Sequence, residues 1–147
     1  MTALDPAKYT GFLIRRAQQA HAALWLREAS SEITSVQFGA LNLLQLHPGI
    51  DQRTLGEHLQ LDRSTIADVA RRLEQRGYIE RDRDPADRRR NILRLTPNGV
   101  AVVATMQPRV NRVNQILVSA LSQADRTELH RLLNALLTSP QITGLVR

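Results

Sequence analysis

Residues 62–95 constrain the fold more than any other part of this chain. A helix is predicted to begin at Asp62, a residue type that commonly caps helix N-termini, and to end at Gly77. Between them, apolar residues recur at the spacing of one helix face: Ile66, Val69, Ala70 and Leu73. This face should therefore lie in a hydrophobic core.

The opposite face of the same helix is polar. At about 100° per residue, it carries Ser64, Asp68, Arg71 and Gln75, with Thr65 and Arg72 beside them. All of these side chains can form hydrogen bonds with base edges or phosphates. A polar partner is therefore expected on this face, and the predicted nucleic-acid contacts are Arg63, Ser64, Thr65, Asp68, Arg71 and Arg72.

A basic hairpin is predicted directly after this helix. Two short strands, residues 78–83 and 90–95, flank a tip at 84–89 that mixes turn-forming residues with cations. A solvated surface hairpin would show a similar pattern, but a turn tip this rich in arginine serves no packing purpose. A helix followed by a basic hairpin is typical of a winged helix, with predicted DNA contacts at Arg81, Arg83, Asp87, Arg88, Arg89 and Arg90.

The charge of the chain favours a polyanionic partner. The 147 residues, enough for one domain with a sizeable core, carry a net charge of +6. Residues 63–94 contain ten arginines and six acidic residues, and Lys8 is the only lysine in the chain. Arginine suits bidentate contacts with phosphate and guanine, so nucleic acid is favoured over a membrane surface as the partner.

Several classes of protein are disfavoured. The chain has no cysteine, which excludes a disulfide framework, a thiol nucleophile and a cysteine-ligated zinc site. The four histidines lie far apart without metal-ligand spacing, and no glycine-rich phosphate loop is present. Neither an apolar run of about 18 residues nor a signal peptide is found. We expect a cytoplasmic protein that is not an enzyme and that has no metal or cofactor.

Three helices are predicted before the helix that begins at Asp62. The first should run from Asp5 and Pro6 to about Ser30 as one long helix. A second is capped by Thr34 and stopped by Pro48 and Gly49, and a short third helix is capped by Asp51. Residues 60–62 would then form the turn of a helix-turn-helix, although the glycine often found in such turns is absent.

Two more helices are predicted after the hairpin. The first, starting at Thr96 and Pro97, should be kinked by Pro108. It carries a heptad-like seam suited to packing against partner helices: Val103, Met106, Val110, Val113 and Leu117. The last helix, capped by Ser122, carries a leucine stripe formed by Leu129, Leu132, Leu133, Leu136 and Leu137.

The ends of the chain are unusually apolar. Termini are normally solvated, yet apolar groups occur at both of them: Leu4, Tyr9, Phe12, Ile142, Leu145 and Val146. Together with the leucine stripe, they predict a dimer interface built from both ends of the chain. A core formed within one chain is the alternative.

These features together resemble the MarR family of bacterial winged-helix regulators. The resemblance is carried by the order of helices, by the segment LDRSTIADVARRLEQRGYIER and above all by the run DPADRRRNILRLTPNG. Within the family it is nearest to regulators of aromatic-acid catabolism. It implies a homodimer, joined through its first and last helices, on a pseudo-palindromic double-stranded DNA operator. It also implies that Arg89 enters the minor groove and that Asp87 helps to hold the wing.

The expected fold is mainly α. It is a single MarR-like domain over residues 1–147, with a winged helix-turn-helix lobe at 34–96, a small β-hairpin wing, and long dimerisation helices within 1–33 and 97–147. The expected function is transcriptional repression, relieved by a small aromatic acid. A ligand-independent architectural DNA-binding protein is the alternative, followed by a small-molecule enzyme.

A ligand site is expected where the first two helices meet. Gln18, His21 and Trp25 share one face of the first helix, and Phe38 and Asn42 lie one turn apart on the second. In the MarR family, ligands commonly sit between the dimerisation helices and the DNA-binding lobe, and Arg15 or Arg16 would pair with a carboxylate. The aromatic residues could equally be ordinary core side chains, with His21 as a neighbour.

Overall fold

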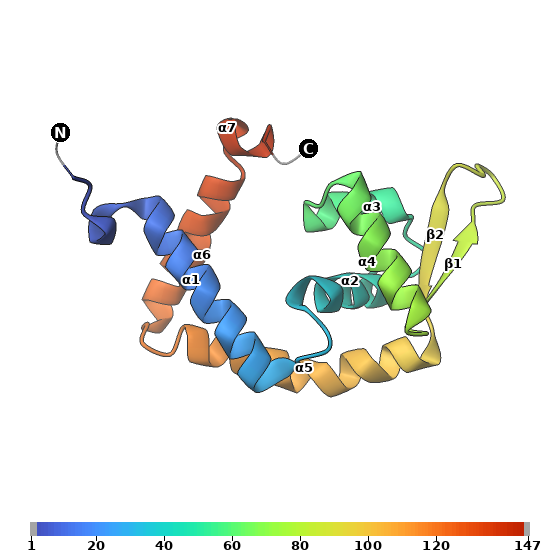
Figure 1. Ribbon diagram of the computed structural model, residues 1–147, viewed down its shortest axis with the longest axis horizontal. Coiled ribbons are helices and arrows are strands. Elements are labelled where there is room, and N and C mark those ends of the chain that lie inside the picture. The colour runs from blue at the N-terminus through green and yellow to red at the C-terminus, as the bar shows by residue number, and fades with distance from the viewer. Residues whose placement is uncertain (1–2, 146–147) are drawn as a thin grey trace.

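The computed structural model describes residues 3–145 and consists of helices around one small hairpin. In Figure 1, α5 (Pro97–Leu117) runs along the base, and α1 (Thr10–Leu24) and α6 (Gln123–Leu137) rise from one end of it. The other end carries α2 (Ser35–Leu46), α3 (Gln52–Leu59), α4 (Arg63–Gln75), and the strands β1 (Ile79–Arg83) and β2 (Asn91–Leu95). A last short helix is α7 (Pro140–Thr143). Val146 lies outside the described residues.

The prediction of one long N-terminal helix was wrong. Asp5 caps only a short 3-10 turn, η1 (Pro6–Lys8), by accepting a hydrogen bond from the Ala7 amide. Tyr9 then has an extended backbone, and α1 begins after it. At the other end, α1 widens into a π-helical turn, η2 (Trp25–Ala29), in which the Ser30 amide donates to the Trp25 carbonyl at 3.1 Å.

The predicted helix-turn-helix is confirmed, and the structure explains how its turn forms without glycine. Gln60 takes the left-handed conformation, with φ of 52°, that glycine usually supplies at the end of a helix. The Leu61 amide donates to the Gly56 carbonyl at 2.9 Å. Glycine occurs instead at position 56, where a Cβ would make a tight contact of 3.0 Å with the Ile66 side chain. The two helices therefore cross at close range.

One hydrophobic core joins the lobe to α5. All four apolar residues predicted for the inner face of α4 are buried, and they share the core with Leu41, Leu44, Leu55 and Leu93. The heptad-like seam of α5 contributes to the same core, since Val103, Met106 and Val113 are buried. α5 thus packs against α1, η2 and α2 of its own chain, and the expected packing of the seam against partner helices stays a prediction.

Pro108 lies inside α5, which continues beyond it to Leu117. The kink expected there stays a prediction.

A large apolar surface is left uncovered at the opposite end. α6 has no buried residue, and four leucines of its predicted stripe are exposed, as are aromatic and aliphatic side chains of the first helix. The exposed apolar residues of this end are Leu4, Tyr9, Phe12, Leu13, Ile14, Leu117, Leu132, Leu133, Leu136, Leu137 and Leu145. Many exposed large apolar side chains on the elements of one end are typical of an interaction site.

Candidate nucleic-acid interface and ligand cavity

The N-terminal turn of α4 is fixed by its cap. The Asp62 carboxylate accepts hydrogen bonds from the Thr65 amide at 2.7 Å and from the Ser64 hydroxyl at 2.8 Å. The Thr65 amide is the main cause of the lowered pKa of Asp62, and the Ser64 hydroxyl adds to it. Both Ser64 and Thr65 are exposed, so the cap presents two hydroxyl groups at the start of the helix.

Two arginines on the outer face of α4 are held by one carboxylate. Asp68 accepts from the guanidinium of Arg71 and from Nε of Arg72, the latter at 2.8 Å. These hydrogen bonds, with that from Arg71 the larger, lower the pKa of Asp68. Arg71 also donates to the Gln75 side chain at 3.3 Å. The helix therefore presents two ordered guanidinium groups to solvent on the face predicted to contact DNA.

Two arginines of the hairpin that were predicted to contact DNA also make contacts within the fold. Arg81 on β1 donates to the Glu74 carboxylate of α4 at 2.8 Å. Arg83, at the end of β1, donates to the Arg88 carbonyl across the tip at 3.0 Å. The strands pair antiparallel, with Ile79 opposite Leu95. Arg81 and Arg83 thus position the hairpin, whatever contact they also make with DNA.

Asp51 connects the helix-turn-helix to the hairpin. Its carboxylate caps α3 through the Thr54 amide at 3.0 Å and accepts from Arg90 at 2.7 Å. Burial alone would raise the pKa of Asp51, but hydrogen bonds from the Thr54 amide, from Arg90 and from the Thr54 hydroxyl lower it to about 2. Arg90 also lies 3.5 Å from Asp84. The guanidinium of Arg90, another predicted DNA contact, is therefore occupied within the fold.

We expect Asp51→Asn to reduce the free energy of unfolding above pH 4 by about 2 kcal/mol, the free energy that corresponds to the lowered pKa of Asp51. Asparagine still caps α3 but cannot attract Arg90. Because the folded pKa of Asp51 is below its ordinary value of 3.8, its contribution is present above that value and is lost as pH falls toward 2. Urea unfolding at pH 7 and pH 2.5 checks this, and an equal difference between variant and parent at both values would contradict it.

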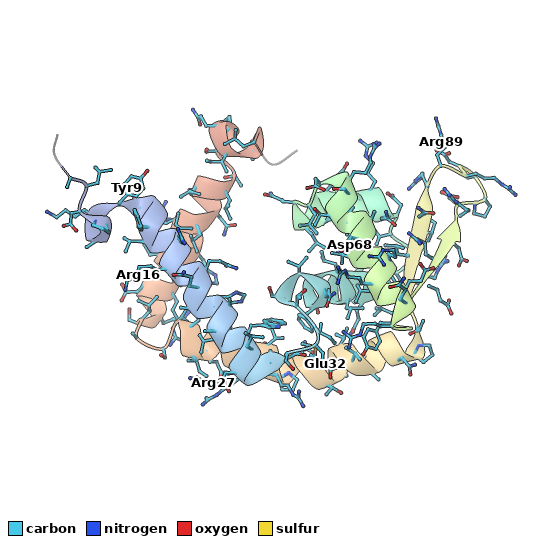
Figure 2. The ribbon with its side chains drawn as sticks, in the orientation of Figure 1. Tyr9, Arg16, Arg27, Glu32, Asp68 and Arg89 are labelled. Carbon is cyan, nitrogen blue, oxygen red and sulfur yellow. The ribbon has the colours of Figure 1, made fainter. Side chains whose placement is uncertain are left out.

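The wing is defined here as residues 79–95. Its tip exposes arginine side chains. Asp87 accepts from the Arg89 amide at 3.1 Å and from its Nε at 3.2 Å, and the Arg89 side chain, first among the causes, lowers the pKa of Asp87. The Arg89 side chain is nevertheless 91% exposed and lies at the outer tip of the hairpin (Figure 2). Arg88 is exposed beside it. A cation held at a protruding tip can enter a narrow minor groove.

Arg89→Ala should weaken binding to the protein's own operator by about 1–3 kcal/mol at fixed salt. The variant loses the cation predicted to enter the minor groove but leaves the bonds of Arg83 and Arg90 in place. A gel-shift titration measures this loss, with Arg131→Ala on α6 as the control. Unchanged operator affinity would contradict the assignment of the wing to the minor groove.

A cavity of about 260 Å³ lies where α1 meets the loop before α2. Trp25 and Ile33 form apolar walls, and the Trp25 indole N–H donates to the Ile33 carbonyl at 2.7 Å. The His21 and Trp25 ring centroids are 6.1 Å apart. The residues lining the cavity are Gln18, His21, Ala22, Trp25, Leu26, Ser30, Ser31, Ile33, Thr34 and Ser35.

Only some of the predicted ligand residues meet in this cavity. Gln18, His21 and Trp25 line it. Phe38 is buried against Trp25, with ring centroids 6.1 Å apart, so it supports the wall as a core residue. Three further predicted residues are not among those lining the cavity: Asn42, Arg15 and Arg16. Arg15 and Arg16 are exposed on α1, and Figure 2 marks the position of Arg16.

Comparison with known proteins decides the family. The family model described as MarR family matches residues 33–90, the segment that forms α2 to α4 and most of the wing. The transcriptional repressor NicR of Pseudomonas putida is 30% identical over 144 residues, which cover 97% of this chain and 91% of NicR. The chain belongs to the MarR family. It is therefore a DNA-binding transcriptional regulator with a winged helix-turn-helix fold, as the sequence predicted.

Solved MarR-type proteins share the whole fold. PcaV of Streptomyces coelicolor, solved in complex with its natural ligand, is 43% identical with a TM-score of 0.92, covering 95% of this chain and 99% of PcaV. BpsR of Bordetella bronchiseptica, whose DNA binding is regulated by 6-hydroxynicotinic acid, is 29% identical with a TM-score of 0.89, covering 94% of this chain and 99% of BpsR.

In this MarR-family chain, no helix within residues 3–145 is long and apolar enough to cross a membrane.

Several functional contacts of this MarR-family regulator were missed by sequence reasoning. Asp51 and Arg90 are 39 residues apart, and neither local spacing nor helical period brings them together. The loop at 30–34 was not predicted to line the ligand cavity, although it supplies four of the ten lining residues: Ser30, Ser31, Ile33 and Thr34. The capping box of Thr34 and Gln37, by contrast, had a local signal, namely a glutamine three residues after the cap.

Proposed function

We propose that this protein is a repressor that binds a pseudo-palindromic operator as a homodimer and is released by a small aromatic acid. The observation that carries the proposal is the cavity at the junction of α1 with the DNA-binding lobe, lined by Trp25 and His21. A ligand bound there can alter the spacing of two recognition helices, which must be about 34 Å apart to occupy successive major grooves. In this proposal the protein acts in the cytoplasm and is not an enzyme.

DNA binding and dimerisation are assigned to different parts of the chain. We infer that residues 34–96 form the DNA-binding lobe and that residues 1–33 and 97–147 form the dimerisation helices within one domain. Most of the exposed large apolar side chains lie on the N-terminal segment, α1 and α6. Exposed arginines lie on α4 and the wing, and others lie on α1, α5 and α6. This arrangement leaves both recognition helices free when two protomers join through their apolar ends.

The DNA contacts differ in purpose. In this proposal, Ser64, Thr65, Arg71 and Arg72 address base edges in the major groove, with Arg63 and Asp68 beside them. Arg88 and Arg89 reach the minor groove, and Asp87 orients Arg89. The remaining arginines, Arg81, Arg83 and Arg90, hold the wing at the correct angle.

The effector is proposed to be a single-ring aromatic carboxylate. A cavity of about 260 Å³ lies just below the usual range for ligand sites, about 300–1,000 Å³, so a small ring suits it better than a larger ligand. His21 and Gln18 offer hydrogen bonds, and Trp25 offers an aromatic face. Arg15 or Arg16 would supply the cation, and Asn42 would be reached only if the cavity opened toward α2. BpsR, which responds to 6-hydroxynicotinic acid, supports this class of ligand.

His21→Ala should reduce the affinity for the acid about 10-fold or more, because a hydrogen bond to a charged group contributes about 1.5–3 kcal/mol. We would use a gel shift on the DNA upstream of the protein's own gene, with benzoate, salicylate, hydroxybenzoates and 6-hydroxynicotinic acid. Quenching of Trp25, the only tryptophan, would report binding. His130→Ala, exposed on α6, is the matched control. The assignment of the cavity fails if His21→Ala folds and responds to the acid as the parent does.

A further inference from the structure

The loop before α2 borders two hollows. On one side lies the cavity lined by Trp25 and His21. On the other lies a depression of about 290 Å³ between the loop, Tyr78 and α5, with Arg109 at its edge. Ser30 and Ile33 line both hollows. The loop therefore has space on either side into which it can move.

The loop is tied to the cavity through its backbone. The buried indole N–H of Trp25 donates to the Ile33 carbonyl at 2.7 Å. The Ser30 hydroxyl accepts from the amides of Glu32 and Ile33, both at 3.0 Å. Any displacement of the Trp25 ring by a ligand must therefore be followed by the Ile33 carbonyl or break this bond.

The carbonyl of the preceding residue, Glu32, is hydrogen-bonded to α4, the proposed recognition helix. Arg76, at the C-terminal end of α4, donates to the Glu32 carbonyl at 2.7 Å and to the Glu32 carboxylate at 3.2 Å. The same guanidinium lies 5.2 Å from the centre of the Tyr78 ring, at the base of the wing. In Figure 2, Glu32 lies below the lobe, near α5. Successive carbonyls of one loop thus join the cavity wall and the end of α4.

We propose that Arg76 and Glu32 are positioning residues that transmit occupancy of the cavity to the recognition helix. The inference rests on the proposed function, because it requires a ligand in the cavity. A ligand that favours a shifted Trp25 favours a shifted loop, which weakens the Arg76 contacts and frees the end of α4 to rotate. Differential affinity of the ligand for the two arrangements is the source of the coupling.

The contact between Arg76 and Glu32 is suited to this role because it contributes little to the stability of the fold. The Arg76 side chain is 31% exposed and the Glu32 side chain 78% exposed, and exposed ion pairs contribute little to folding. Neither residue is placed in the DNA or ligand contacts above. Their substitution should therefore leave the fold and the contacts with the acid close to those of the parent, while loss of the Arg76 contacts can only lower the operator affinity measured without the acid toward that measured with it.

The test compares Arg76→Gln, Glu32→Gln and Arg76→Lys with the parent. Glu128→Gln is the control, since it removes a similarly exposed ion pair, with Arg131, on α6. The readout is the ratio of operator affinities without and with saturating 6-hydroxynicotinic acid or benzoate, whichever binds the parent. Trp25 fluorescence gives the affinity for the acid, and circular dichroism checks the fold.

We expect Arg76→Gln to reduce the ratio by about 2–30-fold, the range found for residues that carry coupling between sites. Glu32→Gln should have a smaller effect because its carbonyl remains, and Arg76→Lys should recover part of the response. A ratio equal to that of the parent in Arg76→Gln, even with weaker operator binding, overturns the inference alone. A parent that responds to none of the acids overturns the proposed function and this inference together.

Discussion

Replacing Leu132 and Leu136 with glutamate should yield a folded monomer whose affinity for a full operator is at least about 100-fold lower. Both side chains are already exposed in the protomer, at 51% and 37%, so the charges do not disturb its core. In a dimer they would place carboxylates inside an apolar interface, at a high desolvation cost. Two linked DNA-binding lobes gain about 10²–10⁴ in avidity, and a monomer loses this gain.

Sedimentation and a gel shift on the same samples measure both effects. The matched control carries Thr127→Glu and Asn134→Glu, which add the same charges on the opposite face of α6, where the side chains bond only to their own helix. It should stay dimeric and bind the operator as the parent does. A Leu132→Glu, Leu136→Glu variant that remains a dimer would show that α6 does not form the interface.

Gly99→Ala should destabilise the protein by about 3 kcal/mol or more, because a side chain there overpacks a contact between two backbones. A Cβ at this position would lie 2.0 Å from the Tyr78 carbonyl oxygen. That carbonyl cannot move away easily, since it accepts from the Thr96 amide at 3.1 Å. The Thr96 hydroxyl also caps α5 and donates to the Gly77 carbonyl at 2.6 Å. The substitution would force α5 away from the base of the wing.

Urea or thermal unfolding checks this prediction. Gly39→Ala is the control, because its Cβ would be in ordinary contact with Leu59, at 3.4 Å, in a helix where alanine is favoured over glycine. Gly39→Ala should be neutral or slightly stabilising. Equal stability of the two variants would contradict the close approach of α5 to Tyr78.

The parts of the fold that the sequence could predict are those specified by neighbouring residues. α4 was predicted from its apolar period and from the residues next to its two ends, Asp62 and Gly77, and the structure places each as expected. The long first helix was mistaken because the local pattern contains no break at Tyr9, where the backbone is extended. The π-helical turn begins at Trp25, whose indole donates to the Ile33 carbonyl, a contact outside the helix pattern.

The candidate sites show the same division. The face shared by Gln18, His21 and Trp25 could be read from helical spacing, and these residues line the cavity. The sequence locates the arginines of the wing. It does not show which of them bond within the fold and which are exposed at the tip, because all of them look alike in sequence. Their partners in the fold distinguish them: Arg81 and Arg90 bond to Glu74 and Asp51, which brace the wing. Arg89, by contrast, bonds only to the neighbouring Asp87 among the described residues and stays exposed at the tip.

A hydroxyl-radical footprint on the operator, with and without the effector acid, tests the central claim most directly. We predict two symmetric protected regions whose centres lie about 10 base pairs apart, as for two recognition helices in successive major grooves. Flanking minor-groove protection should depend on Arg89, and all protection should fade as the acid is added. Protection that is uniform along the DNA, independent of its sequence and unchanged by the acid would contradict the account and indicate an architectural DNA-binding protein.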